Sequence, residues 1–306
     1  MFLFHSIRPA PAGLFLPALL LLAGCSQTAE PAADGRLRLI STAPHLTECL
    51  CAIGAAPLLA GRTDCCDVPR EALRGVPVTG GFGTPWLEPL VRARPTHVLE
   101  TVLADPSLRQ RLAAMGIPVV HVPCSRLAEI PDALRQLGAL TACASRAETL
   151  AASIEAGLAA ARARRRPAGP RPRVLLLFAP DTPITAGRHA FVAELLEQAG
   201  GLNAGRDAEA DYYAVSLEWV LTRDPDLLLC VFDCKGRDPV SFFRTRTGWK
   251  SLRAVRTGRV YSPGDLNTVS RPGPRVMEGL GQIREILERD AAAGRTVPTP
   301  PLPEAP

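Results

Sequence analysis

The chain carries one sequence pattern twice, and this repeat constrains its fold more than any other feature. In each copy a Leu-Glu pair opens a short apolar stretch, a Pro follows seven residues after the Glu, and more apolar residues come next; the copies span 87–99 and 217–229. An early Glu and a terminating Pro are ordinary boundary signals of a short helix. Four of the thirteen positions are identical, and the offset is 130 residues (218 − 88). We therefore expect one helix-to-strand unit used twice, in a chain of two related halves.

The first 25 residues are expected to be an export signal. One basic residue, Arg8, precedes a mostly apolar run at 14–23 that is too short to span a bilayer as a stable helix. The Leu-Ala-Gly-Cys sequence at 22–25 resembles the bacterial lipobox, which implies that Cys25 is the lipid-modified first residue of the mature protein. The alternative is an ordinary cleaved signal with a chance Cys. The lipobox predicts a periplasmic or otherwise extracytoplasmic protein, anchored to a membrane without spanning it.

The remaining sequence divides into five segments. Residues 26–35 are small and polar, as in a flexible tether, and 294–306 form a Pro-rich tail that we expect to be disordered. Between them, strand and helix patterns alternate, give way to an Ala- and Arg-rich helical stretch, and then resume. The sequence predicts an N-terminal α/β lobe at 36–144, a connecting helix at 145–167 and a C-terminal α/β lobe at 168–293. The expected fold class is α/β, with mainly parallel sheets joined by one long rigid helix.

The expected elements are short except for two helices. Strand patterns lie at 37–41, 57–62, 97–100, 119–122, 174–178, 227–231 and 259–262. Helices are expected to begin near Thr47, Trp86, Ser107, His189, Val215, Pro239 and Pro274, and longer ones to cover 127–138 and 145–166.

Charge and cysteine content exclude several classes of function. The chain has 35 basic and 30 acidic residues, and its Arg cluster at 162–173 has no interleaved aromatic residues, which favours a solvated helix end over a nucleic-acid site. Of nine Cys residues, eight remain once Cys25 is lipidated. Export makes disulfides plausible, but the spacing leaves the pairing open and fits no zinc knuckle.

The sequence lacks the patterns that metal sites and enzymes require. The four His residues after the signal are not paired at ligand spacing: His45, His97, His121 and His189. Gly80 to Gly83 do not form GxGxxG, and no HExxH, GxSxG or phosphate-binding loop is present. We therefore expect no metal site and no enzymatic activity.

Several motifs follow one another in a fixed order from the first expected strand to the last expected helix. They are Ile40-Ser-Thr-Ala-Pro-His-Leu-Thr-Glu48, Ala52-Ile-Gly-Ala55, Leu59-Ala-Gly-Arg-Thr-Asp64, Cys66-Asp-Val-Pro69, Gly80-Gly-Phe82 before Leu87-Glu88, and Arg271-Pro-Gly-Pro-Arg275. Together they are similar to the motifs of one family, the class III (helical-backbone) substrate-binding proteins of ABC importers. The resemblance covers about 36–290, and its closest subgroup is the cobalamin-binding proteins, with iron-siderophore binders as near relatives.

The resemblance implies two lobes that face each other across a ligand cleft, with one helix limiting their relative motion. It also implies that Glu88 and Glu218 dock on an ABC permease dimer, which works with a cytoplasmic ATPase. Carboxylate pairing with Arg is directional and suits registration of two proteins. The alternative is that both Glu residues only complement helix N-termini. A surface lipoprotein without a permease is a further alternative, because Ser26 after Cys25 permits outer-membrane sorting.

The resemblance implies cobalamin or another corrinoid as the transported ligand, with no cofactor, and an iron-siderophore as the second choice. Phe82 and Tyr212 fall where cobalamin binders carry stacking aromatics, while Cys65 stands where such proteins often have Tyr or Glu. A corrinoid needs aromatic faces and neutral donors, whereas an anionic chelate needs a cationic donor. Further candidates on the cleft-facing loops are Trp86, Tyr213, Phe232 and Arg271.

Overall fold

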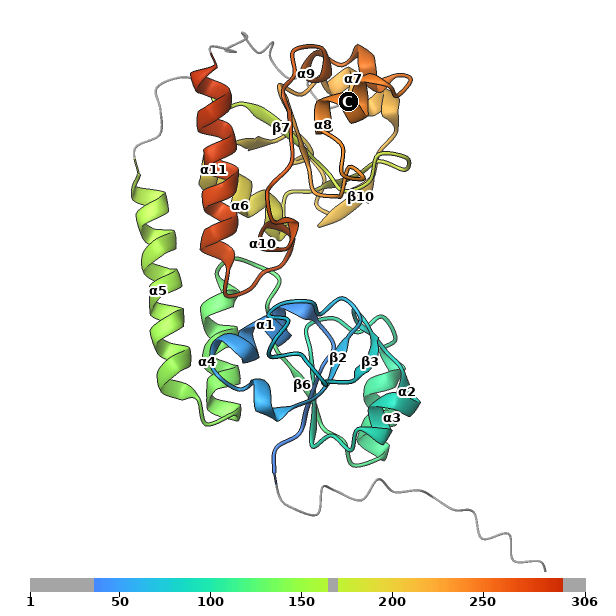
Figure 1. Cartoon of the computed structure of the whole chain (residues 1–306), viewed down its shortest axis with the longest axis vertical. Helices are drawn as coiled ribbons and strands as arrows, with labels where there is room; N and C mark the ends of the chain where they lie inside the picture. The colour runs from blue at the N-terminus through green and yellow to red at the C-terminus, as the bar shows by residue number, and fades with distance from the viewer. Residues whose placement is uncertain (1–35, 165–169, 294–306) are drawn as a thin grey trace, which may run out of the picture.

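The computed structural model describes residues 36–164 and 170–293. The expected signal peptide with Cys25, the tether, the Pro-rich tail, and Arg165 and Arg166 of the Arg cluster lie outside the described residues. The described chain forms two α/β lobes, and one helix, α5 (Ala144–Ala163), runs along the same side of both (Figure 1). Twenty residues give this helix a length of about 30 Å. None of the helices in the described ranges is long and apolar enough to cross a membrane.

The N-terminal lobe is built on a six-stranded sheet in the order β4-β3-β2-β1-β5-β6. Strand β4 is antiparallel to β3, and all other neighbours are parallel. Its strands are β1 (Leu39–Ser41), β2 (Leu59–Thr63), β3 (Val78–Gly81), β4 (Thr84–Pro85), β5 (His97–Glu100) and β6 (Val119–His121). Its helices are α1 (Pro44–Ala52), α2 (Leu87–Arg92), α3 (Ser107–Ala114) and α4 (Glu129–Leu140), with a 3-10 turn at Ala56–Leu58.

The C-terminal lobe holds a parallel four-stranded sheet in the order β12-β11-β7-β9 and an antiparallel pair, β10-β8. Its strands are β7 (Arg173–Leu177), β8 (Ile184–Ala186), β9 (Leu202–Asn203), β10 (Tyr212–Ala214), β11 (Leu227–Cys230) and β12 (Val260–Tyr261). Its helices are α6 (Phe191–Ala199), α7 (Leu217–Arg223), α8 (Pro239–Arg244), α9 (Arg253–Arg256), α10 (Leu266–Ser270) and α11 (Val276–Ala292), with a 3-10 turn at Trp249–Ser251.

The two lobes repeat one strand order in one register. The order β2-β1-β5-β6 corresponds to β9-β7-β11-β12, and α2 precedes β5 as α7 precedes β11. Val98 in β5 pairs with Ile40 and Val119. Leu228, 130 residues later, pairs in the same way with Leu175 and Val260. The helix-to-strand unit predicted from the sequence repeat is thus confirmed in both lobes.

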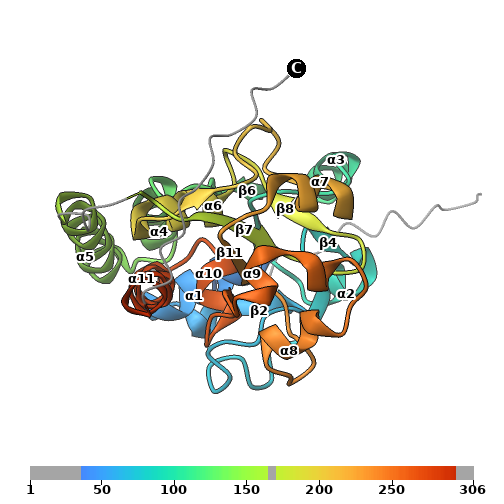
Figure 2. The same ribbon diagram turned by 90° about the horizontal axis from the view of Figure 1, so that it is seen from above.

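The connecting helix packs closely on both lobes. A methyl group at Gly138 of α4 would lie 2.4 Å from the Ala147 side chain of α5, and one at Gly157 of α5 would lie 2.8 Å from Met277 of α11. Figure 2, seen along the long axis, shows α5 and α11 side by side at one edge. One continuous apolar core includes buried residues of both sheets, such as Leu39 and Leu176. This shared core limits how freely the lobes can move against each other.

Local sequence explains where several helices begin and end. Pro44 begins α1, a position that needs no backbone N–H donor, so the helix starts before the predicted Thr47. The Ser216 hydroxyl accepts a bond from the Trp219 backbone N–H at 3.0 Å and caps α7. Gly200 adopts the left-handed conformation that ends α6. All seven predicted strands are present, with ends shifted by up to two residues.

Five strands and two helices were not predicted. They are β3, β4, β8, β9, β10, α9 and α10, and each is two to five residues long. Segments this short contain too few residues to show a hydrophobic period. Their pairing depends on neighbours that the sequence alone does not reveal.

Candidate functional site: the cleft between the lobes

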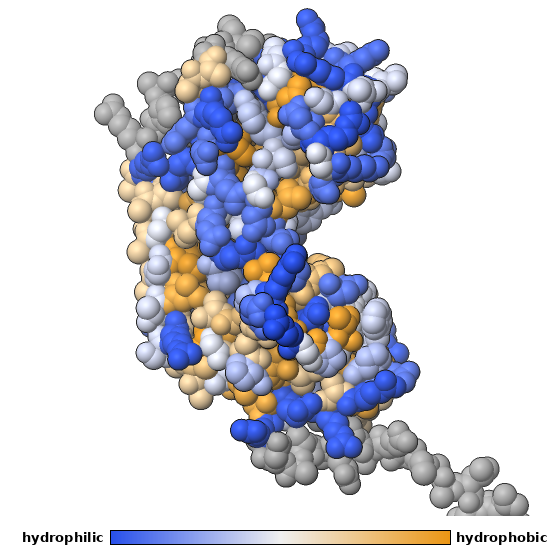
Figure 3. Space-filling model, viewed as in Figure 1, coloured by the Kyte–Doolittle hydropathy of each residue, from blue (hydrophilic) through white to orange (hydrophobic). Residues whose placement is uncertain are grey.

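The carboxyl ends of the two sheets face each other. Arg271, in the segment after β12, donates to Asp67, in the loop after β2, across 2.7 Å. The Leu127 backbone N–H, in the loop after β6, donates to Glu194 of α6 across 2.9 Å. Figure 3 shows the surface hollowed between the lobes, on the side away from α5. Because open parallel sheets bind ligands at their carboxyl ends, this cleft is the candidate ligand site.

One exposed aromatic ring from each lobe lies at these carboxyl ends. Phe82 follows β3 directly and is 51% exposed, and Tyr212 opens β10 and is 46% exposed. The two residues are separated by the same 130 positions as the sequence repeat, and each lies five residues before the helix that opens its copy of the repeat, α2 or α7. Each ring packs edge-on against a second ring: Phe82 on His45 at 6.2 Å, and Tyr212 on Phe178 at 5.1 Å between centroids. Edge contacts orient both rings and leave apolar surface free for a ligand.

The two ionisable rings at the cleft, the Tyr212 phenol and the His45 imidazole, are both uncharged at neutral pH. Burial, followed by the nearby charge of Asp211, raises the pKa of Tyr212 to about 12. Burial, followed by the positive charge of Arg271, lowers the pKa of His45 to about 4. The His45 Nε2 atom hydrogen-bonds the Thr101 hydroxyl at 3.0 Å, behind Phe82. The phenol and the imidazole therefore present uncharged groups.

A partly buried ion-pair network joins the lobes near His45. The carboxylate of Glu48 on α1 accepts bonds from Arg271 Nη1 at 2.8 Å and from Arg275 Nε at 2.9 Å. Arg271 also reaches Asp67, and Arg275 reaches Asp265 at 2.6 Å. Two guanidinium groups against three carboxylates leave one net negative charge. The network offers no surplus cation for an anionic ligand.

Cys65 and Trp86 are exposed on the N-terminal lobe. The Cys65 thiol donates to Asp64 Oδ1 at 3.0 Å, and its carbonyl accepts a bond from Arg271 at 3.0 Å. The hydrogen bond to Asp64, with partial burial, raises the pKa of the Cys65 thiol, which favours the protonated form. Trp86 directly precedes α2 and is 52% exposed. Cys65 adjoins the network through Arg271, whereas Trp86 lies next to the α2 surface that carries Glu88.

Tyr213 and Phe232 do not join the aromatic pair. Adjacent strand residues point to opposite faces, so Tyr213 turns away from the face that Tyr212 presents. Its hydroxyl donates to the Gly205 carbonyl at 2.9 Å, and its ring packs on Trp219. Phe232 is half-buried and contacts the rings of Phe242 and Phe243 in the core of the C-terminal lobe. Both aromatic side chains therefore have structural partners of their own.

The sequence interpretation missed three residues at the cleft. His45 and Phe178 support the exposed rings, and Val102, in the loop after β5, is 55% exposed. Val102 lies beside the Phe82 turn, where a side chain on Gly83 would come within 2.7 Å of the Val102 carbonyl. His45 lies inside the family motif that follows β1, which was its available signal.

Glu88 and Glu218 occupy corresponding exposed positions. Each lies in the first turn of its helix. Exposed, half-buried and buried residues follow in the same order over 84–90 and over 214–220. Glu88 forms an exposed ion pair with Arg92 at 2.5 Å. Neither Glu contributes to the network that joins the lobes. Both carboxylates therefore face solvent, as a docking role requires.

The described residues contain no group of three or more His, Cys, Asp or Glu side chains placed to hold a metal ion. The eight described cysteines are free thiols: Cys49, Cys51, Cys65, Cys66, Cys124, Cys143, Cys230 and Cys234. None of the disulfides considered from the sequence is present among them.

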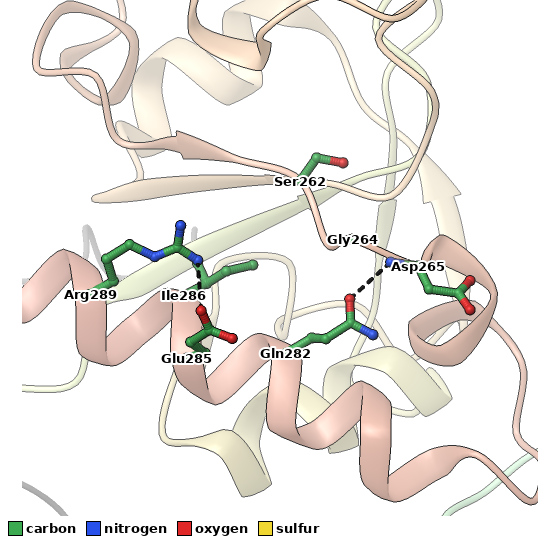
Figure 4. A pocket seen from close by; sticks show the side chains of 7 residues that line it. All are labelled: Ser262, Gly264, Asp265, Gln282, Glu285, Ile286 and Arg289. Atoms are coloured by element: carbon green, nitrogen blue, oxygen red, sulfur yellow. Dashed lines mark hydrogen bonds and ion pairs between the residues drawn. The ribbon is translucent and has the colours of Figure 1, made fainter.

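A separate cavity lies on the C-terminal lobe between α11 and the segment after β12 (Figure 4). The Gln282 side chain accepts a bond from the Asp265 backbone N–H at 2.9 Å, and Glu285 pairs with Arg289 at its edge. The cavity has no aromatic lining and includes none of the cleft rings. A large apolar ligand has no matching surface there.

The family model described as periplasmic binding protein matches residues 39–265. The chain therefore belongs to the periplasmic binding protein family, which confirms the family resemblance, the two-lobed α/β fold and the expectation that it is no enzyme.

Similarity to individual proteins agrees with this membership. The chain is 27% identical over 255 residues to the vitamin B12-binding protein of Vibrio parahaemolyticus, covering 82% of this chain and 89% of that protein. It is 24% identical over 260 residues to YvrC of Bacillus subtilis, an uncharacterized ABC transporter substrate-binding lipoprotein. The match covers 83% of this chain and 80% of that protein. The periplasmic heme-binding protein RhuT from Roseiflexus has a similar structure, with a TM-score of 0.74 and 26% identity over 84% of this chain and 100% of that one.

Proposed function

We propose that this chain is the substrate-binding component of an ABC importer, and that it captures cobalamin or a related corrinoid between its lobes. The observation that carries the proposal is the pair of exposed rings, Phe82 on the N-terminal lobe and Tyr212 on the C-terminal lobe, each five residues before a helix of the repeat. A corrin ring is wide and partly apolar, so it gains most from aromatic surface on both lobes. The similarity to a vitamin B12-binding protein supports the same ligand class.

A second candidate is an iron chelate, either heme or a ferric siderophore. The observation that favours it is the structural likeness to the heme-binding protein RhuT. The charge of the Arg271 network argues against it, because Arg271 and Arg275 already pair with three carboxylates. An anionic chelate would have to displace one of these pairs, whereas a neutral corrinoid would not.

Delivery is proposed to use Glu88 and Glu218. Both carboxylates are exposed, lie 130 residues apart and begin corresponding helices. A two-fold symmetric permease dimer would present two equivalent basic pockets to them, and charge-assisted bonds would fix the register. Trp86, Cys65 and Arg271 are proposed to border the bound ligand; Tyr213 and Phe232 are proposed to support the cleft from behind.

The protein is proposed to remain attached to a membrane through Cys25. This proposal rests on the Leu-Ala-Gly-Cys sequence at 22–25 and on the similarity to a relative named as a lipoprotein. Acyl chains contribute about 0.8 kcal/mol per buried methylene, so several chains give durable attachment. The domain boundaries proposed from the sequence place a ten-residue tether, 26–35, between this anchor and the first lobe.

Native mass spectrometry of the purified protein tests the ligand class. The protein is mixed with equimolar cyanocobalamin, hemin and a ferric hydroxamate siderophore, and the mass of the complex identifies the bound compound. We expect one cyanocobalamin per chain. Exclusive binding of hemin or of the siderophore would instead establish the second candidate, and binding of none would overturn both.

A further inference from the structure

Arg271 lies next to the proposed ligand site and is almost fully engaged. Its side chain is 13% exposed and donates to the Glu48 carboxylate, the Asp67 carboxylate and the Cys65 carbonyl. Its charge acts on His45, whose ring supports Phe82. The guanidinium group is therefore close to the aromatic surface, but its donors point at protein acceptors.

The two carboxylates that hold Arg271 differ in surroundings. Glu48 is 5% exposed and is shared with Arg275, so it belongs to the buried junction of the lobes. Asp67 is 50% exposed, and its other oxygen accepts a long bond, 3.3 Å, from the Asn267 amide. Partial burial acts to raise the pKa of Asp67, but the Arg271 guanidinium holds it below its usual value. Asp67 is thus an ionised group that both solvent and a bound ligand can reach.

We propose that Asp67 is a specificity-determining residue, which makes the cleft prefer neutral macrocycles to anionic ones by occupying a donor of Arg271. The inference rests on the proposed function and adds the reason for its choice of ligand. An anionic ligand would need that donor and would meet the charge of Asp67, whereas a corrin amide needs neither. Discrimination against a wrong ligand commonly uses such a repulsive group.

The variant Asp67→Asn tests the proposal, because it keeps the size of the side chain but removes the negative charge that binds Arg271 and repels an anion. Affinities of the full protein for cyanocobalamin and for hemin, a planar macrocycle with two carboxylates, are measured by tryptophan-fluorescence titration. We expect Asp67→Asn to strengthen hemin binding about tenfold, the effect of one charge contact, and to change cyanocobalamin binding less than about twofold. Asp67→Glu, which keeps the charge, should retain the original preference.

The matched control is Asp132→Asn on α4, a carboxylate that is 82% exposed and lies away from the cleft. It should leave both affinities unchanged. Thermal unfolding of each variant confirms that it is folded. An unchanged ratio of the two affinities in Asp67→Asn, or equal weakening of both ligands, would overturn the inference alone. If the unmodified protein bound neither macrocycle, the proposed function would fail and this inference with it.

Discussion

Glu48 and Arg271, which lie 223 positions apart in the sequence, form an ion pair across the junction of the two lobes, with 2.8 Å between Oε1 and Nη1. The Glu48 side chain is 5% exposed and binds Arg275 as well. One carboxylate of the N-terminal lobe thus fixes two guanidinium groups of the C-terminal lobe. This contact, the shared apolar core and α5 together limit the relative motion of the two lobes.

Glu48→Gln should destabilise the protein strongly. The substitution leaves Arg271 and Arg275 without their common buried counter-charge, and breaking a buried pair costs about 3–5 kcal/mol. The free energy of unfolding in urea measures the loss. Glu155→Gln is the control, because Glu155 pairs with Arg135 at the surface, where solvent screens the two charges and such a pair adds little to stability. Equal losses in the two variants would show that the junction does not depend on Glu48.

His45 should make stability depend on pH. Its pKa is lowered to about 4 from 6.5, by burial first and then by Arg271. Above pH 6.5 the imidazole is neutral in both states, but between pH 6.5 and 4 the unfolded chain binds a proton that the folded chain does not. The free energy of unfolding should therefore decrease as the pH is lowered from 6.5 to 4, by about 3 kcal/mol at most.

Urea unfolding at pH 7.5 and at pH 4.5 measures this effect. His45→Gln should remove most of the dependence that His45 causes, whereas His189→Gln, at an exposed loop position, should retain it. A pH profile that His45→Gln leaves unchanged would contradict the assignment.

Charge reversal at both docking positions should separate capture from delivery. Glu88→Arg with Glu218→Arg would place like charges against the basic pockets proposed for the permease, which is expected to cost several kcal/mol of association. Ligand affinity should persist while uptake in cells that carry the cognate permease is lost. Exposed Glu71→Arg with Glu278→Arg is a control of equal charge change. Loss of ligand binding in a folded docking variant would assign these carboxylates to the cleft or the fold instead.

Cys25→Ser should abolish lipid attachment. A Ser hydroxyl does not replace the thiol in this modification, so the variant should be released after other cleavage or keep its signal peptide. Detergent phase partitioning and intact mass of the unmodified protein and the variant measure the outcome. An unmodified protein that enters the aqueous phase without acyl mass would show that 22–25 are not a lipobox.

The repeat in the sequence was sufficient to predict the doubling of the fold. Apolar runs and the Pro at 95 and 225 mark the ends of corresponding helices and the starts of β5 and β11. The same offset relates Phe82 to Tyr212, because both precede those helices. Such patterns can be recognised in the sequence because helix ends and buried strands each require particular residues at neighbouring positions.

The roles of individual site residues were harder to predict from the sequence. Arg271 was predicted as a ligand contact, but its carboxylate partners lie about 200 positions earlier, where no sequence period connects them. Tyr213 was predicted as a further candidate on a cleft-facing loop, but β10 places its side chain on the face opposite to that of Tyr212. Side-chain direction and long-range pairing depend on the folded chain, so sequence patterns could not settle them.

Calorimetric titration of the protein with cyanocobalamin tests the proposed ligand directly. We expect one binding site per chain, and binding on the order of a hundredfold weaker in Phe82→Ala with Tyr212→Ala, because each buried aromatic contact contributes a few kcal/mol or less. The control is Leu221→Ala, at an exposed position on α7, which should bind cyanocobalamin normally. Phe242 would not serve as a control, because its ring is buried in the core of the C-terminal lobe. The absence of heat and of any thermal shift with cyanocobalamin in the unmodified protein would contradict the proposed function.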